Sequence, residues 1–251
     1  MDPVSAEERG GAAWITLSRP PLNVLDIPAI RRLEETLRPL ASRRDLKAVV
    51  VRSALPGVFS AGVDVRDHVR ERIAEMLEAF HGMLRVLREL PQATIAAVDG
   101  RCLGGGCELV ACCDLVLATE RSTFGQPEID LACFPPFACA LLPRLIGRAA
   151  YELVLGGAAI PAREAERIGL ITRGVEHLDA ETAAWVERLA GKSGAALALA
   201  RRALREGSEG TLWDAVGRTE RLYRDELAAT ADAEEGVRAF LEKRPPRWRD
   251  R

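Results

Sequence analysis

The sequence has no excess of basic residues and no long apolar run, and both absences limit the functions it can have. Its 35 Lys and Arg are balanced by 37 Asp and Glu, which leaves a formal net charge of −2. No basic surface is therefore offered to nucleic acid or anionic lipid. No stretch approaches the roughly 18 apolar residues of a membrane span. The first twenty residues lack a signal peptide's basic start and apolar middle, so we expect a cytoplasmic protein that binds neither nucleic acid nor membrane.

Metal-ligand spacings are also missing. The six cysteines fall in one stretch of the chain, at Cys102, Cys107, Cys112, Cys113, Cys133 and Cys139. A structural zinc site needs close pairs such as C-x2-C completed by further Cys or His. None of these cysteines forms such a pair, and the three histidines lie elsewhere. We expect reduced thiols in the core and no metal site.

Three common catalytic and nucleotide-binding motifs are lacking as well. The glycine-rich segments do not match G-x-G-x-x-G, a phosphate-binding loop ending in Gly-Lys-Ser/Thr, or the G-x-S-x-G turn of serine hydrolases. Dinucleotide, nucleotide-phosphate and serine-hydrolase functions therefore lose their main support. The composition is otherwise that of a globular protein, with 48% hydrophobic and 29% charged residues over 251 positions. Such a chain fits one large domain, or a domain with an appendage.

The pattern of apolar residues predicts an α/β architecture followed by a helical region. Five segments have the composition of short strands: 13–17, 48–52, 94–98, 114–118 and 171–175. Helical periodicity or composition marks ten more: 30–40, 73–87, 104–111, 137–145, 149–155, 162–168, 180–190, 194–206, 212–229 and 233–241. We expect residues 1–190 to form the core and residues 191–251 a C-terminal helical region. That region should pack on its own core or on a neighbouring subunit.

Three glycines at the start of a predicted helix form the first candidate site. Gly104, Gly105 and Gly106 follow the strand 94–98, and Glu108 comes three residues after Gly105. Glycines there allow close approach of a ligand or another backbone, and free N–H groups at a helix N-terminus bind anions. On a helix, Glu108 lies on the same face as Gly105. The alternative is a glycine-rich turn whose Glu only complements the helix dipole.

Two further segments share this character. Phe59-Ser60-Ala61-Gly62-Val63-Asp64 follows the strand 48–52, and Phe124-Gly125-Gln126-Pro127-Glu128-Ile129 follows the strand 114–118. The second segment carries a carboxylate bounded by proline, twenty residues beyond Glu108. A single Glu in such a turn is ordinarily solvated.

Taken together, these segments and their order resemble the crotonase (enoyl-CoA hydratase/isomerase) superfamily over nearly the whole chain. The resemblance also covers Cys-Asp-Leu-Val-Leu-Ala at 113–118 and the closing Phe-Leu-Glu-Lys-Arg-Pro-Pro-Arg-Trp at 240–248. It implies a ββα spiral core with a C-terminal helical region for oligomerisation, arranged as a homotrimer or homohexamer. It also implies an acyl-CoA thioester as substrate and no cofactor, because coenzyme A arrives with the substrate.

The resemblance assigns roles to four residues. The N–H groups of Val63 and Gly105 match the oxyanion hole that holds the thioester oxygen. Glu108 and Glu128 match the two glutamates that act on one water in hydratases. By family analogy Glu108 is the base and Glu128 the proton donor, and a shared water is compatible with the reverse order as well. Relatives with other reactions keep one of these glutamates or neither, so their joint presence favours hydration. A double-bond isomerase and a non-catalytic RNA-binding or scaffold relative are the alternatives.

The acyl group is predicted from departures from the usual pattern. Typical hydratases continue from Q-P-E-I into a segment of the kind I-P-G-x-G-G, whereas this chain has Phe134, Pro135 and Pro136. These residues and 63–68 look like the cyclohexa-1,5-diene-1-carbonyl-CoA hydratases of anaerobic aromatic degradation. The alternative is that they are neutral loop differences in a straight-chain enoyl-CoA hydratase of fatty acid metabolism.

We assign the remaining pocket residues more broadly. The predicted substrate-binding residues are Ala61, Asp64, Val65, Arg66, Gly104, Phe134, Pro135 and Pro136. His68 and His81 have two alternatives, lining the acyl pocket or facing solvent, and we expect them to face solvent. Arg66 is a candidate for the CoA phosphates, but Pro56-Gly57-Val58 offers no cation ahead of the first oxyanion loop, so these contacts stay unassigned.

Overall fold

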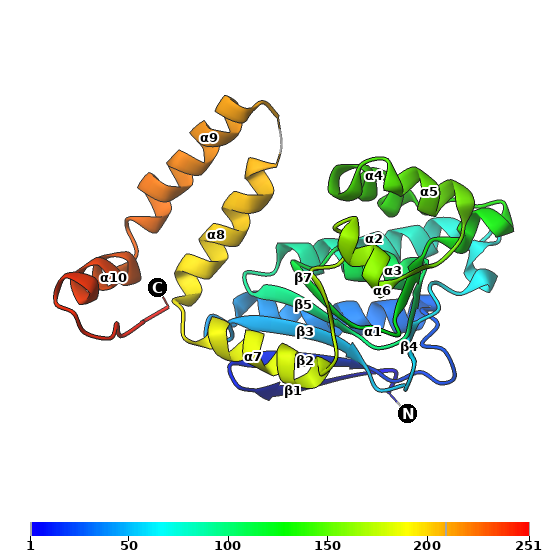
Figure 1. Cartoon of the computed structure of the whole chain (residues 1–251), viewed down its shortest axis with the longest axis horizontal. Coiled ribbons are helices and arrows are strands. Elements are labelled where there is room, and N and C mark those ends of the chain that lie inside the picture. The colour runs from blue at the N-terminus through cyan, green and yellow to red at the C-terminus, as the bar shows by residue number, and fades with distance from the viewer. Residues whose placement is uncertain (1, 209, 251) are drawn as a thin grey trace.

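The computed structural model describes residues 2–208 and 210–250, and its centre is a six-stranded sheet (Figure 1). In spatial order the strands are β1 (Val4–Arg9), β2 (Ala12–Leu17), β3 (Ala48–Ser53), β5 (Ala93–Val98), β7 (Leu115–Thr119) and β10 (Arg173–Val175). β1 pairs antiparallel with β2, and every later pair is parallel.

A smaller sheet stands beside the first. It contains β4 (Val58–Ser60), β6 (Arg101–Leu103), β8 (Thr123–Gly125) and β9 (Ile160–Pro161) in that order. β4, β6 and β8 each come next in the chain after a strand of the large sheet, and each is followed by a helical segment. The chain thus repeats a ββα unit, which brings the ends of β4, β6 and β8 side by side because these three strands pair in parallel.

Helices surround both sheets. The α-helices are α1 (Ile27–Leu37), α2 (Ile73–Glu89), α3 (Gly105–Ala111), α4 (Pro136–Ile146), α5 (Ala149–Gly156), α6 (Ala162–Arg167), α7 (Leu178–Ala190), α8 (Gly194–Gly207), α9 (Leu212–Arg221) and α10 (Ala231–Leu241). Short 3-10 turns η1 (Arg38–Ser42), η2 (Val65–His68) and η3 (Pro127–Leu131) link them, and a π-helical turn η4 (Leu222–Leu227) extends α9.

Strands β2, β3, β5 and β7 are mostly apolar because both faces of the sheet are buried there, whereas the edge strand β1 is exposed over five of its six residues. Along β2, Ile15 packs into the cluster that contains α1 and α2, whereas Trp14 packs into the cluster that contains Val186 of α7. Successive side chains of a strand point to opposite faces, so β2 contributes side chains to the hydrophobic clusters on both sides of the sheet. Helix α3 is the most deeply placed, since all seven of its residues are buried.

The C-terminal helices α8, α9 and α10 extend from one end of the sheet as an arm (Figure 1). The tail returns to the core, because Asp250 pairs with the buried Lys47 and accepts a hydrogen bond of 2.8 Å from the N–H of Gly194. The arm nevertheless leaves Trp213 and Phe240 about four-fifths exposed, at 78% and 82%.

The sequence predicts the large sheet and the helices well, with three kinds of error. It misses β1 and the short strands β4, β6, β8 and β9. The predicted single helix 212–229 is α9 followed by the π-helical turn. The description of the cysteines as core thiols is wrong for Cys139, which is exposed.

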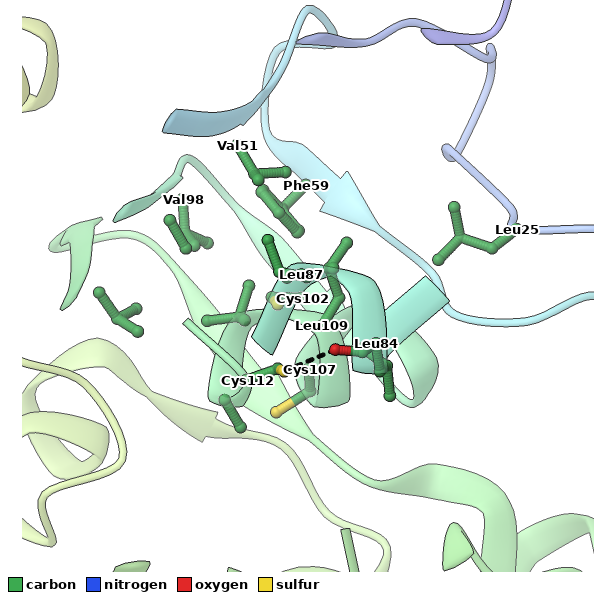
Figure 2. Packing of buried hydrophobic residues seen from close by; sticks show 14 of the residues in the cluster. Leu25, Val51, Phe59, Leu84, Leu87, Val98, Cys102, Cys107, Leu109 and Cys112 are labelled. Atoms are coloured by element: carbon green, nitrogen blue, oxygen red, sulfur yellow. Dashed lines mark hydrogen bonds between the residues drawn. The ribbon is translucent and has the colours of Figure 1, made fainter. Parts of the chain in front are cut away.

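Three of the other cysteines do lie in the core. Cys102, Cys107 and Cys112 are buried among leucines, and Cys112 donates to the carbonyl of Leu84 (Figure 2). Burial raises the pKa of the Cys112 thiol to about 12, so this sulfur stays protonated. Among the described residues, no group of three or more His, Cys, Asp or Glu is placed to hold a metal ion. Nor does any helix in that part of the chain reach the length and apolarity of a membrane span.

Candidate active site

The loop after β4 presents one backbone donor. Leu25 pairs with this loop as a parallel bridge, donating to the carbonyl of Gly62 (2.8 Å) and accepting from the N–H of Asp64 (3.1 Å). In a parallel bridge, the residue between the two bonded neighbours turns its own N–H away from the partner strand. The N–H of Val63 is therefore directed away from Leu25, and no other described backbone group accepts its hydrogen.

The second donor comes from the start of α3. Gly105 is the first residue of this helix, where backbone N–H groups have no partner within the helix. A Cβ on Gly105 would lie 3.3 Å from the nitrogen of Val63 and 2.6 Å from its Cγ2, so the two loops touch at these residues. The preceding Gly104 has φ = +51°, a conformation that side chains rarely adopt. Glycine is thus required at both positions by geometry.

Glu108 lies one turn into α3 and is 5% exposed. Its Oε1 accepts a hydrogen bond of 2.8 Å from the N–H of Ala138, near the start of α4. Burial raises the pKa of Glu108 to about 7, with a further upward effect from the charge of Glu128, and the N–H of Ala138 acts against this rise. Near neutral pH this carboxyl can therefore both accept and hold a proton.

Glu128 reaches the same place from η3. A Cβ on Gly104 would lie 2.5 Å from its Oε1, so the carboxyl rests against the glycine turn. Its Oε2 is buried, and no described residue offers it a hydrogen bond. Burial raises the pKa of Glu128, and the charge of His68 acts in the opposite direction. The two carboxyls thus approach the two N–H donors from different elements.

These groups share a cavity of about 520 Å³. Of the sequence-predicted residues, those lining it are Ala61, Val63, Val65, Gly104, Gly105, Glu108, Glu128, Phe134, Pro135 and Pro136. Asp64 and Arg66 are absent from its described walls. Instead, the Asp64 carboxylate pairs with the guanidinium of Arg66 at 2.6 Å, and Arg66 points into solvent with its side chain 81% exposed.

Helix α2 supplies a wall that the sequence-based site omits. Met76, Leu77 and Phe80 line the cavity together with His68 and His81. The expectation that the two histidines face solvent is therefore wrong. The apolar stripe of α2 could have indicated this wall, but its periodicity does not tell a core contact from a contact with ligand.

Comparisons with known proteins identify the family of the chain. The family model described as enoyl-CoA hydratase/isomerase matches residues 7–251. A cyclohexa-1,5-dienecarbonyl-CoA hydratase of Thauera aromatica is 37% identical, over 98% of this chain and 95% of its own length. A probable enoyl-CoA hydratase of Rhizobium meliloti is 35% identical, over 98% of this chain and 97% of its own length.

Solved structures extend the agreement to the fold. An enoyl-CoA hydratase of Bacillus anthracis superposes with a TM-score of 0.93 at 29% identity, covering 99% of this chain and all of that one. An enoyl-CoA hydratase of Mycobacterium smegmatis gives a TM-score of 0.92 at 30% identity, with 98% of each chain covered. The fold is that of the crotonases, with helices at its C-terminus, as the sequence predicts. The chain is a hydro-lyase that belongs to the enoyl-CoA hydratase/isomerase family.

Proposed function

We propose that this enzyme adds water to cyclohexa-1,5-diene-1-carbonyl-CoA, with Val63 and Gly105 as the oxyanion hole and Glu108 and Glu128 as the proton-transfer groups. One observation carries the hydration half of the proposal: two carboxyls and two free backbone N–H groups converge on one cavity. An isomerase needs a single carboxyl to move a proton, and the second would have no task. The non-catalytic scaffold alternative leaves both buried carboxyls without a purpose.

The proposed chemistry follows from where charge develops. Attack of water on the β-carbon moves an electron pair onto the thioester oxygen, and the N–H groups of Val63 and Gly105 stabilise this enolate. One such donor typically contributes about 3–4 kcal/mol to the transition state. Backbone donors suit the task because no rotamer change can displace them.

In the proposed reaction one carboxyl accepts a proton and the other donates one. Glu108 takes a proton from the attacking water while the oxygen of that water bonds to the β-carbon. Glu128 then delivers a proton to a carbon of the enolate, which collapses to the product. General acid–base assistance of this kind contributes roughly 10²–10⁴-fold in rate. The pKa of about 7 at Glu108 suits a base that must release its proton again near neutral pH.

The cyclic substrate rests on the loop at the cavity mouth and on the similarity to the Thauera enzyme. Phe134, Pro135 and Pro136 line the cavity in a chain segment where hydratases of straight-chain substrates carry glycines. Prolines fix the backbone and an aromatic ring offers a flat apolar surface, so this wall suits a rigid planar ring better than a flexible chain. The sequence similarity points to the same substrate, since the Thauera relative is named for it.

A panel assay tests the proposal. Turnover of cyclohexa-1,5-diene-1-carbonyl-CoA and of crotonyl-CoA should be compared by following product hydroxyacyl-CoA chromatographically. We expect kcat/KM to favour the cyclic diene. A strong preference for crotonyl-CoA would reject the cyclic substrate but keep hydration. If the only product were an acyl-CoA with a shifted double bond and no added water, the proposed hydration would be ruled out.

We further propose a homotrimer or homohexamer in the cytoplasm. The exposed apolar side chains of the arm, among them Trp213 and Phe240, support contact with another copy. Sedimentation velocity measures the assembly directly, and a monomer at micromolar concentration would contradict this part of the proposal.

A further inference from the structure

His68 combines a tethered ring nitrogen with a place on the wall of the catalytic cavity. It ends η2, the short turn that follows the Val63 loop. Its Nδ1 lies 3.0 Å from the carbonyl oxygen of Asp64. A carbonyl only accepts hydrogen bonds, so Nδ1 carries the hydrogen, and in the neutral ring Nε2 keeps its lone pair. The tether therefore leaves Nε2 available for another partner.

Glu128 has a carboxyl oxygen that lacks a hydrogen-bond partner among the described residues. Its buried Oε2 receives no hydrogen bond from any described residue. A buried polar atom without a partner is unfavourable, because it has lost its hydrogen bonds to water. His68 and Glu128 line the same cavity, and a positive charge on His68 acts to lower the pKa of Glu128 against the effect of burial.

The other charged groups near His68 are already engaged or lie on other walls. On its own segment, Asp64 pairs with Arg66 at 2.6 Å and Asp67 pairs with Arg72 at 2.7 Å. Both carboxylates are thus neutralised by arginines. Across the cavity, the titratable groups are Asp130 beside Glu128 on η3, Glu108 on α3, His81 on α2 and the free thiol of Cys133 after η3. The pKa of His81 is lowered by burial, which disfavours its charged form.

We propose that His68 is a positioning residue and proton relay for Glu128, acting on that carboxyl through Nε2 across the cavity and exchanging its proton with solvent. This inference rests on the proposed function of Glu128 as the proton donor. After one turnover Glu128 is a carboxylate and Glu108 is a carboxylic acid. The imidazolium of His68 gives its Nε2 proton to Glu128 and takes another from solvent, while Glu108 releases its proton to solvent. The site returns to its starting state with no net change in charge.

The decisive variant is His68→Asn. An asparagine amide takes the place of Nδ1 and can still donate to Asp64, so the turn is kept, but nothing replaces Nε2. We expect kcat to fall about tenfold or more with KM little changed, less than the 10²–10⁴-fold loss for a group that itself transfers the proton to substrate. The activity limb that reports ionisation of Glu128 should move to higher pH, and added imidazole should restore part of kcat.

Two controls separate this inference from the function beneath it. His177→Asn changes an exposed histidine ahead of α7 and should leave kcat, pH profile and imidazole response as in the parent. Glu128→Gln should be inactive with or without imidazole. If Glu128→Gln is inactive but His68→Asn matches the parent in kcat and pH profile, the relay is overturned and the hydration mechanism stands. If Glu128→Gln remains active, the two-carboxylate mechanism itself fails.

Discussion

The N–H of Ala138 donates to the carboxyl of Glu108 over 2.8 Å, although the two residues are 30 positions apart. Helix α4 begins with Pro136, which has no N–H, so Phe137 and Ala138 provide its first free donors. The loop that shapes the acyl pocket therefore leads directly into the helix end that holds the proposed base. A change in this loop alters substrate fit and the orientation of Glu108 together.

Glu108→Gln should abolish hydration while the fold persists. The amide oxygen can still accept from Ala138, but an amide takes no proton from water, so we expect kcat to fall by roughly 10²–10⁴-fold. The measurement is hydroxyacyl-CoA formation under saturating substrate. Glu120→Gln, which changes an exposed glutamate in the turn after β7, is the matched control. Turnover within a few-fold of the parent for Glu108→Gln would rule out this residue as the base.

The same substitution should change how stability depends on pH. The pKa of Glu108 is raised to about 7 in the folded chain, so between about pH 4.5 and 7 the folded state binds more protons than the unfolded state. Stability from this group is therefore complete at low pH and lost as pH rises, by about 3 kcal/mol at most. Glu108→Gln removes the buried charge.

Urea unfolding of the parent and Glu108→Gln at two pH values checks this. We expect the variant to gain on the parent near pH 8 and to lose most of that advantage near pH 5. An advantage that grows as pH falls would show that the carboxylate form of Glu108 is the stabilised one.

Gly104→Ala should damage catalysis through Glu128. Its added methyl would lie 2.5 Å from Oε1 of that glutamate, and φ = +51° strains any side chain. We expect kcat to fall by about 10²-fold, the lower end of the range for losing a proton-transfer group, and a free energy of unfolding lower by about 1–3 kcal/mol. Gly156→Ala, at the end of α5 with no atom near its added methyl, should leave kcat unchanged. Equal kcat for both variants would mean that Glu128 does not need the glycine turn.

Phe134→Ala should weaken binding of the ring. Phe134 is 65% exposed in the free enzyme, so a bound ring can still cover it. Losing that contact should raise KM for the cyclic diene roughly tenfold, about 1.4 kcal/mol, and change KM for crotonyl-CoA less. Tyr151→Ala removes another exposed ring, on α5, and serves as control. An equal rise for both substrates would show that Phe134 does not select the ring.

The sequence brings Gly104, Gly105 and Glu108 together because their placement depends on local chemistry, whereas the proposed roles of Val63 and Glu128 are what the resemblance to the crotonases implies. Positive φ and close approach demand glycine at Gly104 and Gly105, and a carboxyl one turn into a helix has a definite place relative to its start. The strands β4, β6 and β8 were missed because three residues are too short to show a period of two. They become strands by pairing with each other, which is tertiary information.

The pocket walls were harder to predict for a related reason. The sequence makes Arg66 a candidate for the CoA phosphates, yet a 3-10 turn directs it to Asp64 and solvent. His81 is expected to face solvent, yet α2 turns it toward the cavity that Phe80 also lines. Which side a residue faces depends here on how η2 and α2 pack, and single-sequence patterns do not carry that information.

The bridge between Leu25 and the loop at Gly62 to Asp64 determines which backbone N–H group of this loop points into the active site. Along the paired segment, successive N–H groups point alternately toward Leu25 and away from it. The N–H of Val63 is directed away from Leu25 because Val63 lies one residue before Asp64, whose N–H bonds to Leu25. Inserting or deleting one residue between Ala61 and Asp64 would put a neighbouring residue in the place of Val63, with its N–H directed toward Leu25 instead of the cavity. We therefore expect chain length in this short stretch to tolerate less change than the identity of its side chains.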